Sequence, residues 1–505
     1  MNTVTAFAKR LRCCLIALFA TLSLGVVATP TTSYAAGFEV GENTPRSVAR
    51  GGTGVVNTAD PSAVYFNPAL LGFARDNQLM ITSNVLDLNV EFQRDDFYSE
   101  PGGDPDQTFG PVNNESGLFP APFVAASFDL GPDEFSLGAG LFGPPAYGNP
   151  CYGEIEDGEC QLDREHPMRG MAVETDMVVV YPSVGAAYQF DLGDDRRLDV
   201  GLTAMLAYQN TDFTVVADTD TSPPWRENPD DEVFVQGRNL SGIAPTGVLG
   251  ISFEDGPLRL GASYRPPIRW SLTGTADVGY PPAVEPLNPE MTDDTMHLDT
   301  WHAGSLRLGW GLQWGEHPED SERPRWDLEF NTIWENWSVV DNFRIELDGN
   351  ITPAGGSEDD ALTNFQPVYQ RKGYQDTISL RTGLSYGVNS WLTAHGGGFL
   401  ETAAQPIAYT SADFISWERY SAGGGASIHL PYNLELDLGY SFIYSPSRTV
   451  EQGEVYNPIP MSSCTGPDFQ DDACEQSGTP PGNPQNEGQW SAHFHIFSAG
   501  VAWRY

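Results

Sequence analysis

The last twelve residues of the chain, 494–505, alternate in character and end on an aromatic side chain. In a strand, one face of this segment carries Phe497, Ala499, Val501, Trp503 and Tyr505, and the other carries Ser498, Gly500, Ala502 and Arg504. The closing strand of an outer-membrane β-barrel has this pattern, because one face meets lipid, the other meets a wet lumen and the terminal aromatic residue lies at the membrane interface. A soluble two-sheet protein can also end on an alternating strand, so the rest of the sequence must decide.

The amino terminus has the organisation of a secretory signal peptide. Three basic residues within 9–12 precede an apolar run over 13–28, and the small-x-small cleavage pattern Ser33-Tyr34-Ala35 follows. The apolar run is shorter than the about 20 residues that a membrane-spanning helix requires, and no comparable run follows it. We therefore predict a signal peptide over 1–35 and export of the remaining chain.

The composition fits a β-barrel better than a helical membrane protein. Of 505 residues, 40% are hydrophobic, and 53 Gly, 12 Trp, 20 Tyr and 26 Phe suit strands, tight turns and interfacial aromatic residues. The formal net charge of −42 argues against binding to nucleic acid. Acidic clusters such as Asp95-Asp96 and Asp471-Asp472 lack the regular ligand spacing of a calcium site, so we expect solvated acidic loops, with no metal site and no cofactor.

Four cysteines remain once the predicted signal peptide is removed. Cys151 and Cys160 lie close together in one polar loop, and Cys464 and Cys474 lie close together in another. Four cysteines allow three pairings, and local pairing within each loop is the most economical. A metal site is the alternative, but no Cys-x-x-Cys motif or neighbouring histidine pair supports it. The sequence predicts two loop disulfides in an oxidising compartment.

Fourteen stretches with the character of strands follow one another from residue 78 to the end of the chain. They run over 78–93, 122–130, 134–142, 171–190, 197–216, 244–254, 257–276, 292–312, 324–347, 376–388, 391–402, 417–430, 434–447 and 493–505. Short turns rich in Gly, Pro, Asp and Asn largely alternate with long polar loops between them. An even strand number and this alternation are typical of a closed bacterial barrel with external loops. We predict an all-β fold, a transmembrane antiparallel β-barrel over residues 76–505.

The segment between the signal peptide and the first strand, residues 36–75, has little helical or strand periodicity. It includes Gly51-Gly52-Thr53-Gly54 and Asn67-Pro68-Ala69-Leu70. Some forty residues are too few to form a core of their own, and glycine suits a compact irregular fold. We predict that this segment is a hatch, or plug, in the lumen of the barrel.

Several motifs resemble the outer-membrane hydrophobic-compound channels typified by the long-chain fatty acid transporter FadL. They are Ala36-Gly37-Phe38, Asp60-Pro61-Ser62-Ala63, Asn67-Pro68-Ala69, Trp334-Glu335-Asn336-Trp337-Ser338, Asp376-Thr377, Gly383-Leu384-Ser385-Tyr386 and the aromatic carboxy terminus. The resemblance therefore spans essentially the whole mature chain, and the strand count is not independent of it.

The resemblance implies passive uptake of hydrophobic small molecules, either long-chain fatty acids or aromatic hydrocarbons, through a ligand-gated hatch and a lateral gap in the wall. It implies that Gly37 and Phe38 lie at the pocket end of the hatch, and that Asn67, Pro68 and Ala69 form its structural element. It also implies a kink in the third strand, for which Gly138, Gly140, Gly143 and Pro144 are the candidates, since Gly loosens a strand and Pro removes ladder hydrogen bonds.

The expected location and partners follow from the same resemblance. The protein is expected in the bacterial outer membrane as a monomer, in contact with outer-membrane lipid and lipopolysaccharide. The barrel-assembly machinery would read the aromatic end at Tyr505. A fatty acid needs a cation for its carboxylate, yet Lys372 is the only lysine of the predicted mature chain and falls in a loop. Neutral cargo therefore stays open as an alternative.

Two other functions deserve comparison with a hydrophobic-compound channel. A general diffusion porin is the first, and the predicted hatch disfavours it. A lipase or esterase is the second, because Gly383-Leu384-Ser385-Tyr386-Gly387 fits G-x-S-x-G and His395-Gly396-Gly397-Gly398 fits an oxyanion loop. The first string lies in strand-like sequence without a following helix, so we predict no enzymatic activity. His493 and His495 are expected to pack at an interface or in the lumen rather than to bind a metal.

Overall fold

The structure is a computed structural model. It describes residues 43–74, 77–95, 109–129, 134–144, 150–156, 159–161, 166–171, 174–218, 232–280, 285–317, 320–356, 367–456 and 484–505. The predicted signal peptide, Gly37, Phe38, Cys464 and Cys474 lie outside the described residues. None of the helices in the described part of the chain has the length and apolarity that a membrane span would need.

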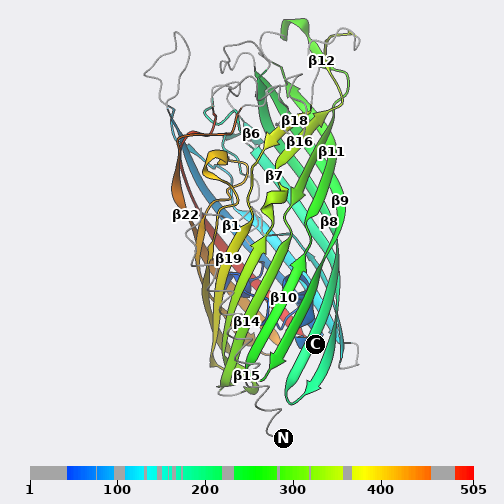
Figure 1. The fold of residues 1–505 in the computed structure, drawn as a ribbon, viewed down its shortest axis with the longest axis vertical. Helices are drawn as coiled ribbons and strands as arrows, with labels where there is room; N and C mark the ends of the chain where they lie inside the picture. The colour runs from blue at the N-terminus through cyan, green and yellow to red at the C-terminus, as the bar shows by residue number, and fades with distance from the viewer. Residues whose placement is uncertain are drawn as a thin grey trace.

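Antiparallel strands form one closed barrel (Figure 1). In chain order its fourteen wall strands are β1 (Gln78–Arg94), β3 (Phe119–Asp129), β4 (Phe135–Phe142), β7 (Glu174–Gly193), β8 (Arg196–Asp218), β9 (Glu232–Asp255), β10 with β11 (Leu258–Arg265, Ile268–Gly279), β13 with β14 (Thr295–His302, Ser305–His317), β15 with β16 (Asp320–Glu335, Asn342–Leu347), β18 with β19 (Val368–Arg371, Thr377–Asn389), β20 (Leu392–Glu401), β21 (Arg419–Leu430), β22 (Leu434–Val450) and β23 (Gly488–Arg504). Pairing of β23 with β1 from Arg504–Gln78 to Gly488–Arg94 closes the ring. The predicted barrel is confirmed.

Small elements lie beside the wall. β2 (Val112–Asn113) extends the pairing of β1, while β5 (Glu154–Glu156) pairs with β6 (Glu159–Gln161) and β12 (Pro289–Met291) pairs with β17 (Ile351–Pro353). Single 3₁₀ turns are η4 (Glu285–Leu287), η5 (Trp337–Val339) and η7 (Ile407–Tyr409).

The closing strand β23 has the two faces that its sequence predicts. Phe497 is 50% exposed and Trp503 is 44% exposed on the outward face, whereas Ser498 is 6% exposed on the inward face. The outward residues of β7, β8 and β9 are also apolar and exposed, for example Val184, Leu202 and Leu249. An apolar outer band with a polar or small inner face fits insertion into lipid.

Several predicted strand boundaries were wrong. The prediction of 257–276, 292–312 and 324–347 as single strands fails, because each is interrupted. Pro266 and Pro267, which have no N–H for a ladder, separate β10 from β11, and η5 separates β15 from β16. β9 begins at Glu232 and not at 244, because its ladder with β8 continues outward through residues that were predicted to form a loop.

The amino-terminal segment Asn43–Ala74 lies inside the barrel and is almost entirely buried. It contains α2 (Pro45–Ala49), α3 (Ala63–Phe66) and η2 (Pro68–Phe73). Helix α2 contacts β20 to β23, whereas η2 contacts β4, β7, β8 and β9, so the segment crosses the lumen from one wall to the other.

Glycines on the inward face of the wall leave room for this segment to pack closely against it. A methyl group at Gly201 would lie 2.3 Å from the Pro68 carbonyl carbon, and one at Gly425 would lie 2.7 Å from the Ala49 Cβ. Similar overlaps with residues 43–74 occur at Gly138, Gly250, Gly261, Gly309, Gly383, Gly397, Gly423 and Gly439. The wall and the segment therefore approach each other at distances that only glycine allows.

Candidate functional site

An apolar pocket lies in the lumen toward the loop end of the barrel. The space between its lining residues is about 540 Å³, part of which is open to solvent. Inward side chains of β7, β8, β13, β16 and β18 line it, together with Trp301 from the outward face of β13 and residues of the loop before β21. They belong to Thr175, Met177, Gln209, Thr211, Phe213, Val215, Leu298, Thr300, Trp301, His302, Phe343, Ile345, Gln370, Asp413 and Phe414.

An ion pair lies at the edge of this pocket. The Lys372 ammonium donates to the Asp413 carboxylate and, at 2.8 Å, to Gln370 Oε1, and it lies 4.5 Å from the centre of the Phe343 ring. Lys372 and Asp413 are both buried. Burial lowers the pKa of Lys372, and the Asp413 carboxylate opposes that shift. The one lysine of the predicted mature chain is therefore already neutralised by a partner within the protein.

The Asn67-Pro68-Ala69 element begins η2 as a capped 3₁₀ turn. Asn67 Oδ1 accepts from the Ala69 N–H at 3.2 Å, and Pro68 occupies the first position, where no N–H is needed. Asn67 Nδ2 donates to the Val55 carbonyl at 2.8 Å and to the Ile251 carbonyl of β9 at 3.1 Å. The buried amide thus holds η2 both to its own segment and to the wall.

A buried charge network fixes the middle of the same segment. The Arg50 guanidinium donates to Ser385 Oγ and to Asp327 at 2.7 Å, and lies 3.3 Å from Glu329. Glu329 Oε1 accepts from three consecutive backbone N–H groups, those of Gly54, Val55 and Val56, at 3.1, 2.7 and 3.0 Å. Three N–H groups aimed at one oxygen make an anion-binding nest, which here holds a wall carboxylate.

Arg46 ties the first helix of the segment to a further strand of the wall, β22. Its guanidinium donates to Glu435 of β22, lies 3.8 Å from Asp437 and reaches Asp60 at 3.3 Å. The anchors of Arg46 and Arg50 lie on different strands, so the segment is held to the wall at more than one place.

The structure places two of the third-strand candidates within β4 and two beyond its end. The ladders of β4 with β3 and β7 run without a shift up to Phe142. Gly138 and Gly140 lie within these ladders, and a methyl group at Gly138 would lie 2.7 Å from Val64. Gly143 and Pro144 follow the strand end, and a methyl at Gly143 would lie 2.5 Å from the Val179 carbonyl.

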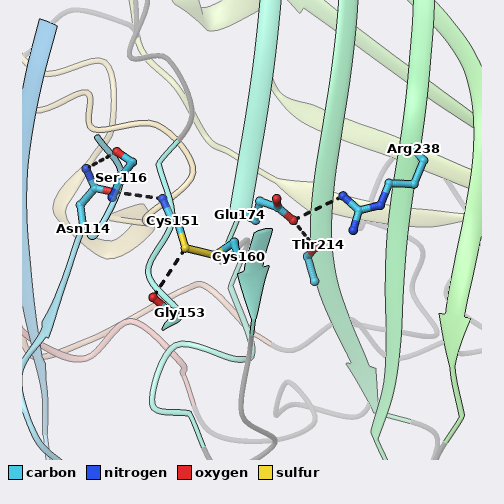
Figure 2. Close-up of a disulfide and its surroundings, with 8 residues drawn as sticks. All are labelled: Asn114, Ser116, Cys151, Gly153, Cys160, Glu174, Thr214 and Arg238. Atoms are coloured by element: carbon cyan, nitrogen blue, oxygen red, sulfur yellow. Dashed lines mark hydrogen bonds and ion pairs between the residues drawn. A yellow bond between two sulfur atoms is a disulfide. The ribbon is translucent and has the colours of Figure 1, made fainter. Parts of the chain in front are cut away.

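The disulfide between Cys151 and Cys160 is confirmed, and Figure 2 shows its surroundings. The Cys151 N–H donates to Asn114 Oδ1 at 2.9 Å, and Cys151 forms a bridge with Glu174 at the start of β7. Asn114 Nδ2 in turn donates to the Leu88 carbonyl of β1 at 2.7 Å. The disulfide segment therefore spans from β1 to β7 above the end of the short strand β4.

Comparison with known proteins decides the family. The sequence matches the family described as outer membrane protein transport protein (OMPP1/FadL/TodX) over residues 25–466. The chain belongs to this family. A search of curated proteins finds no match.

Solved structures have the same fold at low sequence identity. A Pseudomonas aeruginosa FadL homologue is 15% identical, with a TM-score of 0.67 over 93% of this chain and 100% of that one. The Ralstonia pickettii toluene transporter TbuX is 15% identical, with a TM-score of 0.58 over 93% of this chain and 100% of that one. The P. putida toluene transporter TodX is also 15% identical, with a TM-score of 0.58 over 92% and 99%.

Membership of the FadL/TodX family fixes the location and the general activity. The protein is an outer-membrane β-barrel that transports hydrophobic compounds, and it is not an enzyme. The lipase-like strings agree with this, because they lie on adjacent strands β19 and β20. Ser385 Oγ lies 2.8 Å from His395 Nδ1, but it also accepts a hydrogen bond from Arg50 and belongs to the polar contacts of the lumenal segment.

His493 and His495 lie on the outward face of β23. His495 Nδ1 is 2.9 Å from the Tyr440 hydroxyl, and both imidazoles contact the Phe442 ring. These contacts on the outward face are of the interfacial kind, one of the two kinds of packing expected from the sequence.

Sequence reasoning did not identify the pocket residues of this FadL/TodX-family barrel. A signal for them existed in the inward positions toward the outer ends of the strands. There a water-filled lumen would carry polar side chains, but β8 has Phe213 and Val215, and β13 has Leu298. Large apolar residues at lumenal positions beyond the membrane band mark a hydrophobic binding site.

Proposed function

We propose that this protein takes up uncharged hydrophobic small molecules by passive transport, and that the apolar pocket is their binding site. The pocket itself is the observation that carries the proposal, since a diffusion porin has no use for an apolar pocket in its lumen. A ligand entering the pocket exchanges water for apolar side chains, which contributes roughly 25 cal/mol per Å² of buried apolar surface.

The absence of charge in the cargo follows from the ion pair at the pocket edge. A carboxylate would need a cation, but Lys372 is held by Asp413 and Gln370. The structural relatives TbuX and TodX are toluene transporters, and toluene is such an uncharged molecule.

Movement of the amino-terminal segment and exit through the wall complete the proposal. The segment acts as a hatch. Two features support this role: its polar side chains bind several strands of the wall, and the inward-facing wall glycines leave room for it. Cargo leaves sideways at the third strand. In support of this exit, β4 has 8 residues while its neighbour β7 has 20, and the pocket-lining Thr175 and Met177 lie on β7 beyond the last pair with β4.

Two adjacent residues of β7 test the binding site. Met177 faces the pocket, whereas Val178 faces outward and is 43% exposed. Met177→Trp should fill the pocket and weaken binding of an uncharged aromatic fluorophore, N-phenyl-1-naphthylamine, at least about tenfold, or about 1.4 kcal/mol. Val178→Trp should leave the affinity unchanged. Equal affinity of both variants and the parent protein in equilibrium titrations would contradict the proposed site.

Asp413→Asn tests the charge of the cargo. The substitution removes the carboxylate partner of Lys372 and leaves a cation at the edge of an apolar pocket. Binding of a fatty acid should then strengthen about tenfold relative to the fatty alcohol of the same length, because a charge-assisted contact is gained. Competition titrations on parent and variant give this ratio. An unchanged ratio, or a parent protein that already prefers the acid, would refute uncharged cargo.

A further inference from the structure

A polar cleft lies on the outer face of the barrel, toward the loop end. It is formed by four adjacent strands, β11, β13, β16 and β18, which Figure 1 shows near that end. The space between its lining residues is about 850 Å³, part of which is open to solvent. Its charged and aromatic lining residues are Arg269, Asp299, Trp301, Arg344 and Tyr369. Uptake of uncharged cargo through the lumen gives no role to two arginines on the outside of the wall.

The strand register places the two arginines on either side of β13. Arg269 of β11 is the ladder partner of Trp301, and Arg344 of β16 is the partner of Asp299 on one side and of Tyr369 on the other. Two strands that flank a third lie about 10 Å apart. Because arginine side chains are long, both guanidinium groups can reach one ligand that lies over β13.

The two arginines differ in their partners. Arg344 lies 3.3 Å from Asp299 and also pairs with Glu346. Arg269 is exposed, and no residue that the structure describes forms an ion pair with it. The positive charge of Arg269 is therefore available to an external anion, in a chain whose formal net charge is −42.

The cleft lies at the level of the lipid headgroups of the outer leaflet. Tyr264 and Trp334 point outward, and both are ladder partners of Leu306, so they form one row across β10, β14 and β15. Outward aromatic residues of this kind mark the membrane interface. From this row, β11, β13 and β16 continue toward the loops. Arg269 and Arg344 therefore lie at the depth of phosphates and sugars and not of acyl chains.

The outer ends of β7 and β8 carry the opposite charge. Asp176 and Asp212 are ladder partners on the outward face, and Glu174 lies near Asp176. We call these three residues the acidic patch. An anionic headgroup needs a bridging divalent cation to bind there, whereas Arg269 and Arg344 can bind it directly. Direct and cation-bridged binding are therefore separable by removing divalent cations.

We propose that the cleft binds lipopolysaccharide of the outer leaflet, with Arg269 and Arg344 on a phosphate of its lipid A part. Arginine forms forked, charge-assisted hydrogen bonds with phosphate, and the Tyr369 hydroxyl adds a donor. Trp301, which is 36% exposed, offers an apolar surface to the lipid beside that phosphate. The inference concerns the outside of the wall and does not depend on the proposed cargo of the lumenal pocket.

Replacing the unpaired arginine tests the site. The full-length protein in dodecyl maltoside is titrated with diphosphoryl lipid A, and with the same lipid lacking both phosphates, in EDTA, and native mass spectrometry measures the bound lipid. The parent protein should bind the phosphorylated lipid at least about tenfold more tightly, and Arg269→Gln should lose most of this preference. Arg238→Gln is the matched control and should keep it, because Arg238 lies outside the cleft near the loop end and pairs with Glu174 at 3.6 Å.

The proposed site can fail in distinguishable ways. An equal preference for the phosphorylated lipid in the parent and in Arg269→Gln would overturn it, and so would a parent protein that binds both lipids equally. If the parent binds lipid A only without EDTA, cation bridges such as those expected at the acidic patch replace the direct contact. Displacement by inorganic pyrophosphate at equal concentration would show a site for free phosphate and not for a lipid. Binding of N-phenyl-1-naphthylamine to the lumenal pocket should stay unchanged in Arg269→Gln, so failure here leaves the proposed function intact.

Discussion

Replacing Glu329 with alanine should turn a barrel with little steady ionic conductance into one that conducts. Glu329 lies on β15, and its carboxylate accepts from the N–H groups of Gly54, Val55 and Val56 while facing Arg50. The substitution leaves three buried N–H groups without this acceptor and removes one anion beside a buried guanidinium. Breaking a buried ion pair from one side costs about 3–5 kcal/mol, so the undocked fraction of the hatch should rise on the order of a thousandfold.

Single-channel recordings in planar bilayers measure this effect. Glu418→Ala is the matched control, because Glu418 pairs with Arg448 at 2.9 Å toward the loop end of the barrel. That variant loses an ion pair but keeps the hydrogen bonds between the N–H groups of residues 54–56 and Glu329. Limited proteolysis adds an independent measure, since an undocked hatch exposes its backbone. If Glu329→Ala shows as little steady conductance as Glu418→Ala, Glu329 does not hold the hatch in place.

The barrel could be predicted because lipid and lumen impose a two-residue period on every wall strand. In β23 that period runs to Tyr505, and its pairing with β1 is the one that closes the ring. The local disulfide between Cys151 and Cys160 was also predictable, because nine positions of one loop separate the two residues. Such features depend on near neighbours in the sequence.

The interruptions were not predicted, because residues typical of strands continue on both sides of them. Ser263 of β10 donates to the Phe66 carbonyl and faces inward, whereas Ile268 and Trp270 are the inward residues of β11, so the alternation shifts by one residue at Pro266-Pro267. Likewise, the pocket depends on closure of the ring. Phe213 of β8 and Phe343 of β16 meet across the lumen only after all the strands between them have paired.

The Asn67-Pro68-Ala69 element is an intermediate case. An asparagine before proline predicts a capped turn from local chemistry alone. Its second contact, from Asn67 Nδ2 to the Ile251 carbonyl of β9, lies 184 positions away in the sequence, and no local pattern reports it. Local chemistry therefore accounts for the shape of the element but not for the wall on which it rests.

Gly423→Val should displace the hatch while its neighbour Gly424→Val leaves it docked. A methyl group at Gly423 would lie 2.5 Å from the Val48 carbonyl oxygen and 3.2 Å from that of Tyr440. At Gly424 the nearest atom would be the His395 carbonyl oxygen at 3.8 Å, an ordinary contact. Overpacking against backbone costs about 1–3 kcal/mol or more, so α2 should move off β21. The two variants share a strand, a substitution and the gain in strand propensity of valine over glycine.

Two measurements on this pair separate folding of the barrel from docking of the hatch. Both variants should migrate as folded barrels on unheated gels, because valine is favoured in strands and the outer wall is unchanged. Only Gly423→Val should show steady conductance and rapid proteolysis within residues 43–74. If both variants stay silent, the wall tolerates a side chain at Gly423 and the glycine seat is not what positions the hatch. If Gly423→Val fails to reach the folded form while Gly424→Val succeeds, docking of the hatch is a step in barrel folding, and the segment is structural and not a movable gate.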